Sequence, residues 1–275
     1  MLPLPPPNGY WSKVDSLLSK YIWNGRRTRI KRTTLQHYKQ ESGWALPNSQ
    51  YYHWSFTLRP LKQWFDPNSV SSWKIIEENI ISPIRLKAFL FCGLSIKHCA
   101  LRYGPILTYT LNIFKKIERL VGFASKWHKS SPLWHNKYLL SGKKPFVQNI
   151  WADKGIWTFG DINGNNSLLS FNELMTLYNI AKHSLFFYFR LRSALKTQNV
   201  TWGSGLKEHP VVKWLHDAPK SSVSFLYTKL LSLLSPKPNT GEWDRSMGLR
   251  GRTINWETSW HNILYVEAPI ILIIN

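Results

Sequence analysis

The sequence predicts a mainly α-helical protein, an irregular multi-helix assembly with long ordered loops and at most a short β-ribbon near residues 26–46. Three observations support this fold class. Apolar residues recur at spacings of three and four in several segments, which gives a helix one apolar face. Proline, glycine and asparagine separate those segments, as they commonly do at helix ends. The alternation of apolar and polar residues that is typical of half-buried strands is scarce.

The N-terminal part predicts two helices around a basic loop. Asn8 is expected to cap the first helix, and Gly25 is expected to end it. Its apolar stripe consists of Trp11, Val14, Leu18, Tyr21 and Ile22. The stripe of the second helix, which Pro60 is expected to kink, consists of Tyr51, Trp54, Leu58, Leu61 and Trp64. Between Gly25 and Gly43 only Ile30 and Leu35 are aliphatic, so we expect an exposed loop or short ribbon there, not core.

Further helices are predicted along the rest of the chain. They cover about residues 70–80, 84–101, 105–121, 171–178, 184–196, 211–216, 222–234 and 256–264. The face of the longest combines Leu107, Leu111, Phe114, Ile117, Leu120 and Val121. Ser170 and Glu173 form a capping box, so a helix should begin at Phe171. Residues 130–161 are rich in glycine, proline and tryptophan, and we expect an ordered loop with short helices there.

These elements suggest three parts. Residues 1–66 would hold the N-terminal helices with the basic loop, and residues 67–128 would form a helical connector. Residues 129–275 would form a C-terminal helical domain whose last residues are disordered. At 275 residues, the chain is long enough to bury a substantial core.

The net charge identifies the class of partner. The 36 lysines and arginines outnumber 15 acidic residues, which gives a formal charge of +21. Such a chain favours a polyanion, with nucleic acid as the first candidate and an anionic membrane surface as the second. The 15 tryptophans suit cores, interfaces and base stacking equally. No apolar run reaches about 18 residues, so no membrane span is expected. The N-terminus lacks the pattern of a secretory signal, which predicts a nuclear or cytoplasmic protein.

The strongest local signal is the heptapeptide RRTRIKR at residues 26–32, which we call the basic loop. Its five cations are Arg26, Arg27, Arg29, Lys31 and Arg32. The loop could clamp phosphates, act as a nuclear import signal, or be a solvated loop, and we favour phosphate contact. The same role is assigned to Lys143, Lys144, Arg190 and Arg192. Tyr21, Trp23 and Trp44 lie close enough in sequence to stack on bases, although Tyr21 fits the stripe of the first helix better.

No pattern in the sequence predicts catalysis, a cofactor or a metal site. Metal-dependent phosphoryl transfer needs clustered carboxylates, and the only adjacent acidic pair is Glu77-Glu78. Phosphate-binding glycine loops, serine hydrolase motifs and zinc protease motifs do not occur. Cys92, His98 and Cys99 are one ligand short of a closed zinc site. We expect the two cysteines to pack in the core on one helical face.

Several strings resemble the polyproteins of LINE-type non-LTR retrotransposons. IWNGRRTRIKRTTLQ and SGWALPNSQYYHWSFTLRPLKQW, at residues 22–36 and 42–64, are similar to the segment that follows the reverse transcriptase domain. SPLWHNKYLLSGKKPF, GIWTFGDI, LLSFNELMTLYNI and FFYFRLRSAL resemble the C-terminal region of the same polyproteins, and the elements of fish and amphibians come closest. These strings keep the order of the family and cover most of the chain from about Trp11 to Leu264.

The resemblance implies a fragment that begins near the end of the polymerase thumb. In this family the region after the thumb is helical and grips template and target nucleic acid. The polymerase and endonuclease active sites of the family belong upstream of Met1, and the cysteine-rich C-terminal knuckle of many relatives has no counterpart here. We therefore expect a non-catalytic fragment that binds RNA or DNA, with the polymerase portion as a further partner. One alternative is a degenerate remnant that only docks on a missing polymerase body. The other is a membrane-surface protein.

Overall fold

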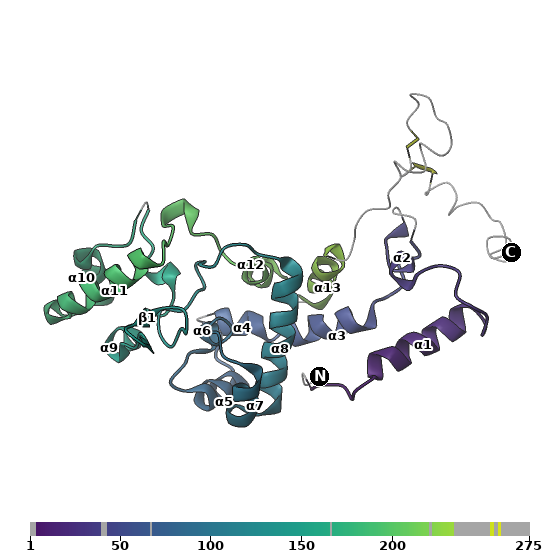
Figure 1. Ribbon diagram of the computed structural model, residues 1–275, viewed down its shortest axis with the longest axis horizontal. Helices are drawn as coiled ribbons and strands as arrows, with labels where there is room; N and C mark the ends of the chain where they lie inside the picture. The colour runs from purple at the N-terminus through teal and green to yellow at the C-terminus, as the bar shows by residue number, and fades with distance from the viewer. Residues whose placement is uncertain are drawn as a thin grey trace. The chain divides into compact units, whose positions relative to one another are not determined.

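The computed structural model describes residues 4–39, 43–66, 68–165, 167–219, 222–233, 254–255 and 258–259. This part of the chain is mainly α-helical, as the sequence predicts (Figure 1). It divides into two compact units. The larger unit contains Trp54–Leu226, and the N-terminal unit contains Pro6–His53 and resumes at Tyr227. The three-part division at residues 66 and 128 stays a prediction.

In the N-terminal unit, helix α1 spans Tyr10–Ile22. Its N-cap is Gly9, with no side-chain hydrogen bond, so the predicted cap at Asn8 is wrong. The chain turns directly after the helix, where the Gly25 amide donates to the Lys20 carbonyl over 2.9 Å. This turn buries Trp23, whereas Tyr21 on the helix remains 86% exposed. The predicted core position of Tyr21 is therefore also wrong.

The segment for which the sequence allows at most a short β-ribbon forms a helical turn. None of the described residues between 26 and 46 belongs to a strand, and α2 spans Arg32–Leu35. The chain returns over this turn, so that the amides of Trp44 and Leu46 both donate to the Leu35 carbonyl, over 3.1 and 2.9 Å. This closure buries the Leu35 side chain and corrects its predicted place outside the core. Gly43 permits the close approach, because a Cβ there would lie 2.0 Å from the His37 carbonyl oxygen.

Asn48 fastens this turn to two further helices. Its Oδ1 accepts from the Tyr51 amide over 3.0 Å, which caps α3, Ser49–Leu58. Its own amide donates to Tyr227 Oη over 2.9 Å, on α13, Ser222–Ser232. Its Nδ2 reaches Gln36 Oε1 over 3.3 Å, just beyond α2. A single residue thus holds the base of the segment that carries the basic loop.

The stripe predicted from Tyr51 to Trp64 is confirmed, because all five of its residues are buried. Pro60 interrupts the stripe as expected, since α3 ends at Leu58 and α4 spans Leu61–Phe65. The next helix, α5, spans Ser72–Ile81.

The single helix predicted over residues 84–101 is wrong. The structure has two short helices, α6 at Leu86–Phe89 and α7 at Ile96–Arg102. Gly93 lies between them with a φ of +72°, a conformation that a right-handed helix does not contain. Cys92 therefore lies outside a helix, although both Cys92 and Cys99 are fully buried, as expected.

Helix α8, Gly104–Val121, is the longest element of the larger unit, with a proline in its first turn. Its predicted face is buried from Leu107 to Ile117, but Leu120 is 45% exposed near the helix end. Helices α7 and α12, Pro210–Asp217, pack on α8, and α4 packs on both α6 and α12 (Figure 1).

Residues 130–165 form an ordered loop around buried aromatic rings, as predicted. Strands β1, Leu140–Ser141, and β2, Lys144–Pro145, pair antiparallel here. Short helices α9, Asn149–Asp153, and η2, Phe159–Ile162, follow. The rings of Trp134 and Trp151 lie 6.3 Å apart, and Trp151 lies 5.1 Å from Phe187. Tryptophan is therefore used for packing in this region.

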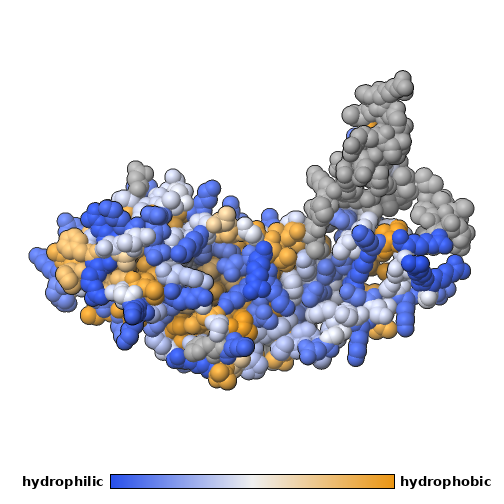
Figure 2. All heavy atoms as spheres, in the orientation of Figure 1, coloured by the Kyte–Doolittle hydropathy of each residue, from blue (hydrophilic) through white to orange (hydrophobic). Residues whose placement is uncertain are grey.

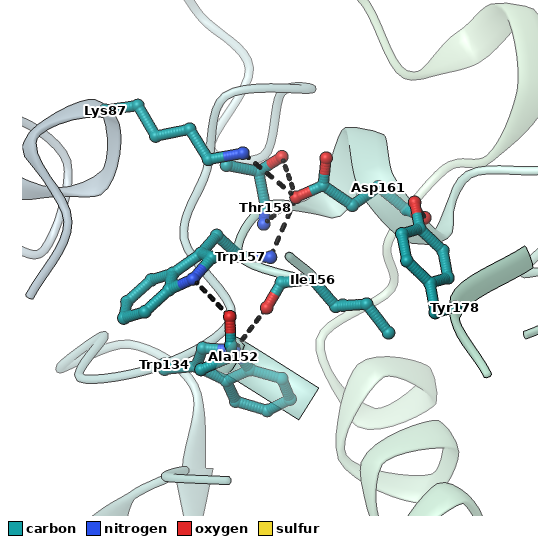
Figure 3. A network of polar contacts seen from close by, with 8 residues as sticks. All are labelled: Lys87, Trp134, Ala152, Ile156, Trp157, Thr158, Asp161 and Tyr178. Carbon is teal, nitrogen blue, oxygen red and sulfur yellow. Dashed lines mark hydrogen bonds and ion pairs between the residues drawn. The ribbon is translucent and has the colours of Figure 1, made fainter. Parts of the chain in front are cut away.

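Asp161 holds this loop in place (Figure 3). Its Oδ2 accepts from the amides of Trp157 and Thr158 over 2.8 and 2.7 Å, and from Thr158 Oγ1 over 2.9 Å. Lys87 Nζ, from α6, lies 3.4 Å from the same oxygen. The Asp161 carbonyl accepts from Tyr178 Oη over 2.8 Å. One aspartate therefore links the loop to α6 and to the end of α10, Phe171–Tyr178.

The capping box is confirmed. The Glu173 amide donates to Ser170 Oγ over 3.3 Å, and the Ser170 amide donates to Glu173 Oε2 over 2.6 Å. Helix α10 begins at Phe171 and ends at Tyr178. The remaining elements are η3, Lys182–Ser184, α11, Leu185–Thr197, and η4, Gly203–Gly205. The helix predicted over 256–264 and the predicted disordered C-terminus lie almost entirely outside the described residues.

Candidate nucleic-acid interface

The basic loop joins α1 to α2 and presents most of its charge to solvent. The exposed cations are Arg26, Arg27, Arg29 and Lys31. None of the four forms an ion pair with another residue in the described ranges. Cations that lie close together and unpaired repel one another, and a phosphate backbone would relieve that repulsion.

Arg32, the fifth predicted cation, is in a different environment. It is the first residue of α2, it is only partly exposed, and it forms an ion pair with Asp15 on α1. Burial also lowers the pKa of its guanidinium from the ordinary value. We infer that Arg32 fastens α2 to α1 and that its charge is already neutralised. The structure therefore distinguishes Arg32 from the other four cations of the loop, and phosphate contact by any of the five stays a prediction.

A hollow of about 190 Å³ lies beside the basic loop, within the N-terminal unit. Its wall is mainly apolar, with Leu18, Ile22 and Trp23 from α1 and the turn after it. Ile30, Lys31 and Arg32 close the other side. Trp23 is thus a wall of the hollow, with its ring 6% exposed, and Trp44 is 39% exposed.

The remaining predicted cations lie in the larger unit, where two segments come together. Lys143 and Lys144 occupy the β1–β2 hairpin, and both are exposed. Arg190 on α11 reaches this hairpin, because its Nη2 donates to Ser141 Oγ over 2.6 Å. Arg192 is exposed on α11. The structure thus places Arg190 beside the two lysines, and we call these three residues the hairpin cluster.

A second basic surface, also in the larger unit, was missed by the sequence analysis. A cleft of about 250 Å³ is lined by three lysines and several aromatic residues, two of which directly follow a lysine in the sequence. The lysines are Lys115, Lys126 and Lys137, and those two aromatic residues are Trp127 and Tyr138. The dipeptides Lys126-Trp127 and Lys137-Tyr138 were the available signal, since each joins a cation to a ring. Lys115 comes from α8 and gives no such local signal.

Two other side-chain features bear on chemistry. Cys92 and Cys99 are buried free thiols, and burial raises the pKa of Cys92 to about 12. A thiol held in its protonated form is a poor metal ligand. Within the described ranges, no three His, Cys, Asp or Glu side chains meet as ligands of one metal ion would. None of the helices in the described part of the chain is long and apolar enough to cross a membrane.

The described tryptophans lie mainly in cores. The buried ones are Trp23, Trp54, Trp64, Trp127, Trp134, Trp151 and Trp157. The high tryptophan content therefore reflects packing more than base stacking, and the exposed cations are the feature that favours nucleic acid. No family model matches the sequence.

Proposed function

We propose that this chain binds nucleic acid through the phosphate backbone and is not itself an enzyme. The observation that carries the proposal is the set of four exposed cations, Arg26, Arg27, Arg29 and Lys31, on one short loop. The loop is held at both ends, by the turn at Gly25 and by the Arg32–Asp15 ion pair. Because its ends are fixed, the loop loses less conformational freedom when it binds a strand.

The hollow beside the loop supports a contact with more than phosphate. Its apolar wall could take the face of a base while Lys31, at its edge, contacts the adjoining phosphate. A base inserted in this way must be unpaired. We therefore propose single-stranded RNA or DNA as the preferred partner of the N-terminal unit.

The resemblance to LINE-type polyproteins supports the same function. We propose that the chain is a fragment of such a polyprotein from the end of the thumb onward, acting in the nucleus or cytoplasm. In that setting the basic loop would hold template or target while a separate polymerase portion performs the chemistry.

The test removes the four exposed charges. A variant with Arg26, Arg27, Arg29 and Lys31 each changed to Gln should lose affinity for a labelled single-stranded RNA by at least about tenfold, because its phosphate contacts are gone. Fluorescence anisotropy measures this. The matched control changes Lys97, Lys116, Lys154 and Lys213 to Gln, since all four are exposed in the larger unit and remove the same charge. An equal loss of RNA affinity in the two variants would mean that the loop contributes only through the net charge of the protein. That result would contradict the proposal.

An exposed apolar patch favours a second function, docking onto a protein. Its members lie on α10 and α11 and are Leu177, Leu185, Phe186 and Phe189. Phe186 is 73% exposed, which is unusual for so large an apolar side chain. Figure 2 shows hydrophobic residues gathered in the region where Figure 1 places these two helices. The polymerase portion of a LINE-type polyprotein is the proposed partner. If the polymerase portion still co-purifies with a Phe186→Ser, Phe189→Ser variant, this patch is not its docking site.

A further inference from the structure

The cleft lined by Lys115, Lys126 and Lys137 lies wholly within the larger unit and owes nothing to the basic loop. Leu90 to Ser95 form one wall, α8 contributes Lys115 and Glu118, and residues 126–138 form the rest. A volume of about 250 Å³ is slightly below the roughly 300 Å³ at which sites for drug-sized ligands begin. The cleft therefore suits one small ligand and not a large cofactor.

The charges in the cleft favour an anion. Lys115, Lys126 and Lys137 face a single carboxylate, that of Glu118. The nearby charge of Lys137 is one of the causes that lower the pKa of Lys115, after burial as the largest cause. Lys115 Nζ also donates to the Leu94 carbonyl, which holds it at the wall. Like charges held close together in this way are stabilised when an anion binds between them.

Lys137 is positioned by the backbone beneath it. A Cβ on Gly93 would lie 2.6 Å from Lys137 Cε, so the side chain lies directly over this glycine. The Lys137 amide also contacts the Cys92 carbonyl over 3.4 Å. The backbone at Gly93 therefore holds the Lys137 stem in the wall of the cleft, with its ammonium group near the Tyr138 ring.

The aromatic residues add a flat surface beside the cations. Lys137 Nζ and Lys126 Nζ lie 4.8 and 5.8 Å from the centre of the Tyr138 ring. Tyr138 is 47% exposed, so part of the residue is open to a ligand. Lys126 Nζ also donates to Gln198 Oε1 over 3.0 Å, a bond that a stronger acceptor can replace.

His128 supplies an unused polar group at the inner wall. It lines the cleft, it is 5% exposed, and its Nδ1 forms no hydrogen bond within the described protein. Its amide donates to Ser131 Oγ over 3.0 Å, and its ring packs against Phe91, Phe123 and His209, so Nδ1 is the unpaired atom. A buried unpaired nitrogen is costly, so the wall of the cleft at His128 carries an unsatisfied polar atom.

We propose that this cleft binds a nucleoside phosphate, with the phosphate at Lys126 and Lys137 and the base against Tyr138. The ligand is either a free mononucleotide or one unit of a single strand, and both present the same phosphate and ring.

The experiment compares three probes by isothermal calorimetry on the full chain: AMP, inorganic phosphate and a short single-stranded oligonucleotide. We expect AMP to bind at least tenfold more tightly than phosphate. The double variant Lys126→Gln, Lys137→Gln should bind AMP at least tenfold more weakly than the wild type. Tyr138→Ala should lower the affinity for AMP to nearly that for phosphate. All three side chains are exposed, so the variants should keep the fold, which circular dichroism checks.

The comparison with the basic loop separates the two proposals. The variant that lacks the four loop charges should bind AMP as the wild type does. If the oligonucleotide binds this variant more tightly than AMP, the natural ligand is a strand; if it binds no more tightly, the ligand is a free nucleotide. Equal affinity for AMP and phosphate would overturn the proposal, as would AMP binding that the double lysine variant leaves unchanged. No heat with any probe would overturn it as well.

Discussion

Replacing Asp161 with alanine is expected to destabilise the larger unit by about 3 kcal/mol or more, which is a large share of the stability of a typical domain. The carboxylate accepts from Trp157 and Thr158 through its Oδ2, and alanine would leave these donors without a partner. Thr158 is only 7% exposed, so water cannot replace the lost acceptor without rearrangement. Lys87 would lose its ion pair at the same site.

Urea denaturation followed by tryptophan fluorescence measures the change, because Trp134, Trp151 and Trp157 surround the site. Asp161→Asn keeps the shape and one acceptor and should fall between alanine and the wild type. Asp153→Ala removes an exposed aspartate from the same loop region and should change the unfolding free energy by less than about 0.5 kcal/mol. An Asp161→Ala protein as stable as the Asp153→Ala protein would show that the network contributes little.

Acid is expected to destabilise the larger unit through two buried histidines. His128 and His209 lie with ring centres 5.0 Å apart and are each packed against the rings of Phe91 and Phe123. Burial lowers the pKa of His128 to about 3, with the nearby His209 as a second cause. Burial likewise lowers the pKa of His209 to about 4. Both rings are therefore neutral in the folded protein at neutral pH.

The sign of the effect follows from where the protons bind. Between the folded values and the ordinary value of 6.5, the unfolded chain binds protons that the folded chain does not. Stability from these histidines is complete above pH 6.5 and falls as the pH drops toward about 3. The loss should be about 2.5 kcal/mol for each histidine, or about 5 kcal/mol for both, by pH 4.5. Glu118 has the opposite effect on stability. Its Oε1 lies 4.0 Å from His209 Nε2, and burial raises its pKa, so the folded protein gains stability from this group as the pH falls.

A double variant isolates the histidine contribution. His128→Phe with His209→Phe keeps aromatic packing and removes both titrating groups. The difference between its unfolding free energy and that of the wild type, measured in urea from pH 7 to pH 4.5, should grow as the pH falls. A constant difference across this range would mean that the two histidines are not the source of the acid sensitivity.

The sequence was most informative where local physics decides the structure. The stripe from Tyr51 to Trp64, its break at Pro60 and the capping box at Ser170 were all predicted, because each depends on residues within a few positions. The errors arise where distant segments decide. Gly93 lies between α6 and α7 directly beneath the Lys137 side chain, in a conformation that interrupts the predicted helix, and the closure of the chain over α2 buries Leu35.

In the candidate site, too, the sequence predicted local features and missed those that depend on distant contacts. The basic loop was evident in the sequence, but the contact that separates Arg32 from its neighbours involves Asp15, on the preceding helix. Arg190 was predicted without its position beside the β1–β2 hairpin. The cleft combines α8 with residues 126–138, and Lys115 stands in no motif that would have identified it. Composition predicts a polyanionic partner, and only the fold determines which cations remain available to it.

The most direct test of phosphate binding is the salt dependence of affinity for nucleic acid. With four loop contacts, the logarithm of the association constant should fall against the logarithm of salt with a slope of about −2.8 for single strands and about −3.6 for duplex. That corresponds to a loss of about 50-fold or about 150-fold between roughly 50 and 200 mM salt. The variant without Arg26, Arg27, Arg29 and Lys31 should lose most of this slope. Binding that is insensitive to salt, or a slope that the loop variant keeps in full, would contradict the proposed function.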